Sequence, residues 1–374
     1  MPDPRVANLA KILVQYSTKV QPKDEVAIFS QPAGLPLVQE IYREIIRAGG
    51  YPYIQLGLLK SHVELEGLDY ILFTEGSEDQ IVHVNRFEEA VRSEFDVMIS
   101  LYSSNNTRVL SNVDPEKMSL RTKAYSDVKK TFFQRSSTGD LRWVLTMYPT
   151  QAYAQDAEMS QSDFERYVYS AMFADTKDPI AEWQAIHDMQ QGLVDWLRGR
   201  QHVEVKGPNV ELTLSIAGRT FFNSDGTRNI PSGEIFTGPV EESVNGWVRF
   251  TYPAVRGGRE VSGIELHFEE GKVVKLSAQK NEDYLRGMLD ADSGARYLGE
   301  FAIGTNKRID RFIKNILFDE KIGGTIHMAL GAGYPETGSK NESAIHWDMI
   351  CDMRDGGQIF VDDELIYESG EFKI

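Results

Sequence analysis

A repeating order of strand, helix and strand in the first half of the chain constrains the fold most strongly. Residues 24–30 (DEVAIFS) have the apolar pattern of a strand, residues 35–50 (LPLVQEIYREIIRAGG) that of an amphipathic helix ending in two glycines, and residues 51–57 (YPYIQLG) that of another strand. The same alternation recurs over residues 87–102 and 114–149. Since strands joined through helices run parallel, this order predicts an α/β fold whose N-terminal domain has an open, mostly parallel sheet flanked by helices.

The pattern changes in the second half of the chain. Helical patterns over residues 160–174 and 178–200 are followed by short alternating runs broken by Gly, Asn and Pro, such as VELTLSIAG and GIELHFEEGKVVKLSA. Runs of this kind predict short strands and therefore a strand-rich α+β domain. We expect two domains, an N-terminal α/β domain over residues 1–176 and a C-terminal strand-rich domain over residues 177–374.

The charge balance excludes several classes of partner. The 374 residues include 40 Lys and Arg against 56 Asp and Glu, a formal net charge of -16, which repels phosphate backbones and anionic membrane surfaces. No apolar run approaches the ~18 residues of a membrane span, and the first residues do not resemble a secretory leader. The single cysteine, Cys351, excludes an intramolecular disulfide. We expect a cytoplasmic protein that binds neither nucleic acid nor membrane.

Two histidines stand inside short apolar strand patterns. His327 lies in TIHMALG, and His346 lies in SAIHWDMICDM, where Asp348 follows two residues later. Side chains two positions apart in a strand share a face, so His346 and Asp348 point to the same side. Polar groups in an apolar strand cost free energy unless they are satisfied. The pattern therefore indicates that these polar side chains bind a ligand.

Two glutamates also occupy apolar surroundings. Glu234 follows a Pro-Ser-Gly turn in NIPSGEIFTGP, and Glu300 lies in RYLGEFAIGTN. Each alone is typical of a salt bridge or a helix cap. With Asp348 and the two strand histidines, however, they form a mixed oxygen and nitrogen donor set that suits two adjacent Zn, Co or Mn ions. We expect the C-terminal domain to be the metal-binding, catalytic domain.

The remaining histidines and the cysteine have simpler interpretations. His267 alternates with Glu265 and Glu269 on one strand face, which fits a metal site but fits the solvent face of a strand more simply. Cys351 in its apolar strand is interpreted as a packing residue. Four other histidines lie in polar or helical contexts without carboxylates at ligand spacing, and we interpret them as surface or packing residues: His62, His83, His187 and His202.

Other common enzyme signatures are missing from the sequence. It has no H-E-x-x-H, G-x-x-x-x-G-K-[ST] or G-x-S-x-G, so single-zinc protease, P-loop and nucleophile-elbow sites lack their local motifs. Residues 330–338 (LGAGYPETG) contain G-x-G without the third spaced glycine of a dinucleotide site.

At these residues the sequence resembles the thermophilic-type metallo-aminopeptidases, the aminopeptidase T and aminopeptidase S group. The resemblance runs, in order, through NIPSGEIFTGPVEESVNG, RYLGEFAIGTN, HMALGAGYPETG and SAIHWDMI. It implies a two-metal exopeptidase that acts on short peptides and forms a homodimer. The metal ligands that it implies are Glu234, Glu300, His327, His346 and Asp348, with Tyr334 also at the site.

The chemistry of such a site suggests catalytic roles. Two divalent cations activate a water molecule for attack on the scissile carbonyl. A carboxylate, Glu300 as first choice and Glu234 as second, would accept the water proton and pass it to the leaving amine. The hydroxyl of Tyr334 would hydrogen-bond the oxyanion or touch a metal ion, although an aromatic side chain after glycine is as often structural.

Two alternatives to this hypothesis remain open. Some proteins similar to this family are iron-dependent dioxygenases that open a dihydroxypyridine ring with a mononuclear site containing the histidine-x-aspartate pair. The presence of both Glu234 and Glu300 favours the two-metal hydrolase. The third possibility is a binding protein that has this scaffold without turnover.

Overall fold

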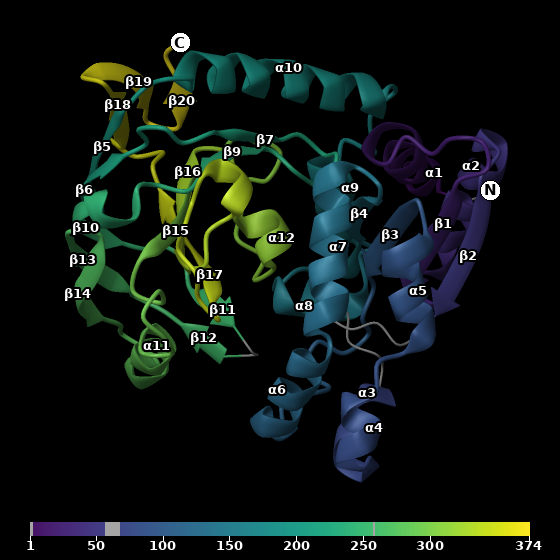
Figure 1. Ribbon diagram of the computed structural model, residues 1–374. Coiled ribbons are helices and arrows are strands. Elements are labelled where there is room, and N and C mark those ends of the chain that lie inside the picture. The colour runs from purple at the N-terminus through teal and green to yellow at the C-terminus, as the bar shows by residue number, and fades with distance from the viewer. Residues whose placement is uncertain (1–2, 57–67, 257–258) are drawn as a thin grey trace. The chain divides into compact units, whose positions relative to one another are not determined.

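The computed structural model describes residues 3–56, 68–256 and 259–374 (Figure 1). The chain divides into two compact units, one made of residues 1–183 and 226–231, and the other of residues 184–225 and 232–374. The first division falls inside helix α10 (Pro179–Leu197), beyond the boundary expected at residue 176. In the described part of the chain, no helix is both long enough and apolar enough to cross a bilayer.

The first unit contains a five-stranded sheet in which every pairing is parallel. The strand order is β2-β1-β3-β4-β8. The prediction of an open parallel sheet flanked by helices is confirmed (Figure 1). The strands are β1 (Glu25–Ser30), β2 (Tyr51–Leu56), β3 (Val97–Tyr102), β4 (Arg142–Met147) and β8 (Asn229–Ile230), the last supplied by the returning segment 226–231.

The helices of the first unit begin and end at residues suited to those positions. Helix α2 (Leu35–Ala48) ends at Gly49, whose φ of 83° lets its N–H reach the carbonyls of the last turn. Helix α4 (Glu78–Val82) begins with a capping box between Ser77 and Gln80. The others are α1 (Pro4–Lys11), a π-helix (Ile12–Ser17), a 3-10 turn (Pro32–Gly34), α3 (Leu68–Glu75), α5 (Arg86–Glu94), α6 (Pro115–Ala124), α7 (Ser126–Thr138), α8 (Gln151–Asp156) and α9 (Gln161–Ala171).

The second unit contains two larger antiparallel sheets and a small hairpin. The eight-stranded sheet has the order β14-β13-β10-β6-β5-β18-β19-β20, and the five-stranded sheet has the order β17-β16-β15-β9-β7. The prediction of a strand-rich second half is confirmed. The strands of the five-stranded sheet, which positions the site, are β7 (Phe222–Ser224), β9 (Glu234–Thr237), β15 (Leu298–Gly304), β16 (Thr325–Gly331) and β17 (His346–Asp352).

The remaining elements of the second unit complete these sheets and their connections. The other strands are β5 (His202–Gly207), β6 (Val210–Ser215), β10 (Asn245–Arg249), β13 (Glu265–Glu269), β14 (Lys272–Ser277), β18 (Gln358–Val361), β19 (Glu364–Glu368), β20 (Glu371–Phe372) and the hairpin β11 (Ala254–Arg256) and β12 (Arg259–Val261). The helices are α11 (Glu282–Leu289), α12 (Ile316–Asp319) and 3-10 turns at Glu241–Ser243 and Pro335–Thr337.

One face of the five-stranded sheet is apolar, and the other has polar side chains. Alternate side chains of its strands, including Ile235, Phe301 and Met328, join buried side chains of β5, β6, β10 and β13 in one apolar cluster. Burial of this surface drives the two sheets together at roughly 25 cal/mol per Å² of apolar area. Because side chains alternate along a strand, the intervening residues point to the opposite face, and this face carries the polar residues of interest.

A β-bulge in β15 determines which face Glu300 occupies. Leu298 pairs with Leu330, whereas Glu300 pairs with Ala329, so Gly299 is the extra residue. Simple alternation would put Leu298 and Glu300 on the same face. With the bulge, Leu298 joins the apolar cluster and Glu300 turns to the other side. Only glycine fits at the bulge, because a Cβ on Gly299 would lie 2.3 Å from the carbonyl oxygen of Ala332.

Substitution of Gly299 by Ala is therefore expected to destabilise the protein. Overpacking of this kind costs about 1–3 kcal/mol, so the midpoint of thermal unfolding should fall by several degrees. The matched control is Gly287→Ala in the exposed middle of α11, where an added Cβ meets nothing within 4 Å. This control should stabilise the helix by about 0.5–1 kcal/mol. Equal midpoints for the two variants in calorimetry would contradict the assignment of the bulge.

Candidate metal centre

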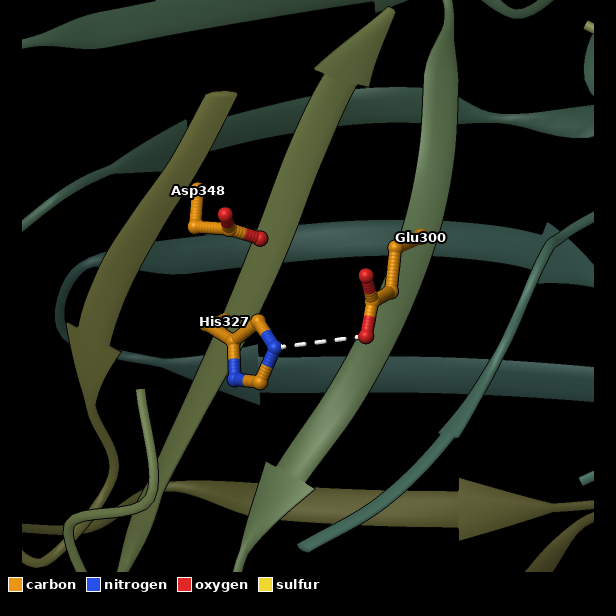
Figure 2. Close-up of side chains that lie close together, drawn as sticks. All are labelled: Glu300, His327 and Asp348. Atoms are coloured by element: carbon orange, nitrogen blue, oxygen red, sulfur yellow. Dashed lines mark ion pairs between the residues drawn. The ribbon is translucent and has the colours of Figure 1, made fainter. Parts of the chain in front are cut away.

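Strand register brings the polar side chains into adjacent rows on one face of the five-stranded sheet. Glu300 pairs with Ala329, which in turn pairs with Asp348, so one row crosses β15, β16 and β17. The neighbouring row contains His327 on the central strand of these three. Figure 2 shows Glu300, His327 and Asp348 projecting toward one another from the three strands. The residue between the two carboxylates on the central strand is an alanine, whose methyl group is too small to separate them.

Glu300 lies between the two imidazoles. Its Oε1 is 3.5 Å from Nε2 of His327, and its Oε2 is 3.3 Å from Nε2 of His346. Each imidazole also faces a second carboxylate. Nε2 of His327 is 3.6 Å from Oε2 of Glu234, and Nε2 of His346 is 3.4 Å from Oδ1 of Asp348. The five residues thus form two histidine-carboxylate pairs with Glu300 in common.

The residues fit divalent cations by geometry and chemistry. Ligand atoms of Glu300, His327 and Asp348 all lie within 4.8 Å of one another. Nδ1 of His346 lies 2.7 Å from the carbonyl oxygen of Ala332, and donation from Nδ1–H leaves Nε2 as an acceptor or ligand. Among the described residues, neither Oε2 of Glu234 nor Nδ1 of His327 has a hydrogen-bond partner, although both are buried. Buried polar atoms of this kind call for a bound group.

The carboxylates and imidazoles shift one another's pKa values. Burial lowers the pKa of His327, but Glu300 and Glu234 outweigh it and raise this pKa to about 9. Burial also opposes the charge on His346, yet Asp348 and Glu300 raise its pKa well above the usual value. Burial raises the pKa of Glu300, but the two imidazoles lower it below its ordinary value. The cluster therefore stabilises opposite charges on neighbouring groups.

Local sequence pattern does not predict that Lys321 is buried beside the centre or that the half-buried Glu320 contacts it. Nζ of Lys321, which is fully buried, contacts the carboxylate of Glu320 and lies 3.7 Å from Oε1 of Glu234. Gly304, the strand partner of Glu234, permits this approach because a Cβ there would lie 2.2 Å from the carbonyl oxygen of Ile322. The available signal was the charged triplet in FDEKIGG, which directly precedes the apolar TIHMALG strand.

Glu234 is held in place by the turn that precedes it. Gly233 has a φ of 119°, and its carbonyl accepts a hydrogen bond from the N–H of Thr305. The side-chain amide of Asn306 donates to the carbonyl of Ser232 at 2.9 Å. These contacts tie the Pro-Ser-Gly turn to the end of β15 and so fix the start of β9, where Glu234 lies.

Tyr334 lies in the connection between β16 and β17. Its ring centroid is 5.2 Å from that of His346 and 5.5 Å from that of Phe236. Burial and then the charge of Glu300 raise the pKa of its phenol well above 10, so the hydroxyl keeps its proton. No described residue forms a hydrogen bond with this hydroxyl.

Glu241 anchors the connection between β16 and β17, which contains Tyr334, to the rest of the unit. Its carboxylate accepts a hydrogen bond from the N–H of Lys340 at 2.6 Å and pairs with Arg219 at 2.5 Å. The guanidinium of Arg219 also donates to the carbonyl of Gly338. Burial raises the pKa of Glu241, but these contacts outweigh it and lower the pKa.

The other described histidines and Cys351 lie outside this cluster. His267 pairs with Glu265 at 3.0 Å on the eight-stranded sheet, and His187 pairs with Asp225 at 2.6 Å. Burial raises the pKa of Cys351 to about 12, which fits a packing residue better than a nucleophile. His62 lies outside the described residues.

Comparisons with known proteins agree with the motifs. A family model described as thermophilic metalloprotease (M29) matches residues 3–372. Aminopeptidase 2 of Geobacillus stearothermophilus is 27% identical over 92% of this chain and 91% of its own, and aminopeptidase T of Thermus thermophilus is 29% identical over 72% of each. The resemblance predicted from the sequence is confirmed.

Solved structures show the same fold. Wild-type AmpT from Thermus thermophilus has a TM-score of 0.85 with 22% identity and covers 99% of each chain. The 2,5-dihydroxypyridine dioxygenase from Pseudomonas putida has a TM-score of 0.54 with 14% identity, covering 98% of this chain and 96% of its own. At these identities the likeness concerns the fold alone.

The small side chain of Ala329 between the two carboxylates gives a first prediction for the site. Ala329→Leu places a larger side chain between Glu300 and Asp348, so titration calorimetry with Zn²⁺ should show affinity reduced at least about tenfold, the effect typical of disturbing the surroundings of a metal site. Ala329→Gly keeps the space and serves as the control. Circular dichroism establishes that both variants fold. Undiminished Zn²⁺ affinity in folded Ala329→Leu would place the cation elsewhere.

The buried Lys321 gives a second prediction. In Lys321→Met the carboxylates of Glu234 and Glu320 lose a buried cation, which costs about 3–5 kcal/mol. The metal-free variant should therefore unfold several degrees below the parent, and added Zn²⁺ should raise its unfolding midpoint by more than it raises the parent's. The control is Lys280→Met, which breaks an exposed pair with Glu260 and should cost at most about 1 kcal/mol. An unchanged unfolding midpoint in Lys321→Met would show that the ammonium group does not compensate the charges of Glu234 and Glu320.

Proposed function

The chain belongs to the thermophilic metalloprotease (M29) family and is a metallo-aminopeptidase, and we propose that it uses two divalent cations to remove N-terminal residues from short peptides. The second unit, which contains every candidate ligand, is on this proposal the catalytic domain. The cations would be held by Glu234, Glu300, His327, His346 and Asp348.

The position of Glu300 between two imidazoles is the observation that supports two cations rather than one. Its two oxygens face different histidines, and each histidine has a second carboxylate of its own. Glu300 would then lie between the two cations, and Glu234, His327, His346 and Asp348 would complete their ligand sets. A shared carboxylate between two nitrogen ligands is a donor arrangement that suits a dinuclear hydrolase.

The cations would supply a nucleophile from water near neutral pH and stabilise negative charge at the scissile carbonyl. Glu300 is our first choice for the group that accepts the proton of the attacking water and transfers it to the leaving amine, and Glu234 is our second. The hydroxyl of Tyr334, which has no partner among the described residues, would donate a hydrogen bond to the developing oxyanion.

Further parts of the proposal rest on the resemblance and on composition. We propose Zn, Co or Mn as the cations because imidazole and carboxylate ligands suit all three. The relatives are named aminopeptidases, which supports short peptides as substrates. A homodimer is proposed from the family likeness, and a cytoplasmic location because a single cysteine fits a reducing compartment. The net charge of -16 supports a protein that does not bind nucleic acid.

Peptidase activity is tested with leucyl and arginyl p-nitroanilides in the presence of Co²⁺ or Zn²⁺. Loss of a general base typically costs about 10²–10⁴-fold, so Glu300→Gln should lower kcat by that factor. Glu269→Gln, which changes an exposed carboxylate on another sheet, is the control and should match the parent. Release of p-nitroaniline at the same rate by the parent and Glu300→Gln would refute the role of Glu300 as general base.

Metal counting separates the peptidase from the ring-cleaving alternative. Elemental analysis of the purified protein, and an anomalous-scattering map of a metal-soaked crystal, should find two cations at the five residues. A single iron, together with oxygen-dependent opening of 2,5-dihydroxypyridine, would instead support the mononuclear dioxygenase.

A further inference from the structure

A row of aromatic side chains extends away from the candidate metal centre. The rings of Tyr334 and His346 are 5.2 Å apart, those of Phe236 and Tyr334 are 5.5 Å apart, and those of Phe222 and Phe236 are stacked at 5.7 Å. All four residues belong to the second unit. The row therefore begins at a candidate ligand and ends at Phe222 on the outermost strand of the sheet.

Strand register places Phe236 on the same face of the sheet as the candidate ligands. Phe236 lies two positions beyond Glu234 on β9, and it pairs with Ala302, which pairs with His327. Phe222 pairs with Phe236 on the other side. Because Ala302 is small, no large side chain intervenes between the ring of Phe236 and the imidazole of His327 along this row.

The rings of this aromatic row are more exposed than the side chains on the other face of the sheet. Phe222, Phe236 and Tyr334 are half-buried, whereas Ile235 and Phe301, which face the apolar cluster, are almost completely buried. The aromatic row thus combines contact with the metal centre and residual apolar surface. Packing between the two sheets does not account for it, because the row lies on the opposite face.

We propose that Phe236, with Phe222 behind it, binds the side chain of the substrate's N-terminal residue and selects apolar side chains there. This inference rests on the proposed function, since it takes the scissile carbonyl to lie at Glu300 and His327. The first side chain is attached to the carbon next to that carbonyl, so it must lie close to the cations. Aromatic rings supply apolar contact without a charge, which favours leucine-like over acidic or very small residues.

The inference is tested by the ratio of kcat/KM for leucyl p-nitroanilide to that for glycyl p-nitroanilide. In Phe236→Ala this ratio should fall about tenfold or more, because hydrophobic pockets discriminate by 10–200-fold per methylene group or similar increment, and the change should appear in KM for the leucyl substrate. The matched control is Phe312→Ala, which removes a half-buried ring stacked on Tyr252 at 5.2 Å and should leave the ratio unchanged. An unchanged ratio in Phe236→Ala overturns the inference.

A binding measurement separates this inference from the proposed function. Calorimetry on the zinc-loaded protein compares L-leucine hydroxamate with glycine hydroxamate, neither of which requires turnover. The parent should prefer the leucine compound by about tenfold or more, and Phe236→Ala should lose that preference while its Zn²⁺ affinity stays at the parent value. If no peptide is cleaved but the preference follows Phe236, the inference stands and the peptidase proposal fails. Cleavage without any preference for leucine in the parent overturns the inference alone.

Should Phe236→Ala fail to fold, Phe236→Leu and Phe222→Ala provide the same comparison with less loss of volume. Both should reduce the leucine preference in the same direction. Retention of the full preference in both variants would overturn the inference.

Discussion

Compensation of buried charge is the constraint on which the organisation of the second unit depends. Glu234, Glu300 and His327 are almost completely buried on a sheet whose other residues are largely apolar, and Lys321 is buried in the turn before β16. Isolated charges in such surroundings are costly, so each must face a partner of opposite sign. Their arrangement meets this need, because Glu300 faces two imidazoles and Glu234 faces both an imidazole and an ammonium group.

The two faces of the five-stranded sheet have different roles, one in packing and one in presenting the donor side chains. The apolar face packs against the eight-stranded sheet and provides a rigid support, and the opposite face presents the donors. The donor rows also contain small residues, Ala302 and Ala329, which put little side-chain volume between the donors. A site built on strands of this kind is held more precisely than one built on loops.

Much of the candidate site was predictable from residue type and local pattern. His327, His346 and Asp348 are conspicuous because they interrupt apolar strands, and Glu234 and Glu300 because they occupy apolar contexts. Lys321 and Glu320 were not identified, because a charged triplet at the end of a short helix normally lies on the surface. Lys321 is buried where the chain passes close to Gly304, an approach that no local pattern reports.

The sequence by itself determined the parallel sheet of the first half, the strand-rich second half and the identity of the polar residues that need partners, because these depend on periodicity and residue type over short stretches. Only the tertiary structure decided that segment 226–231 returns to the first unit, that the bulge at Gly299 turns Glu300 to the donor face, and that Phe236 lies in the same row as His327 with Ala302 between them. The physical reason is that register and burial arise from contacts between residues far apart in the chain, whereas a local pattern fixes only the direction in which each side chain points relative to its neighbours.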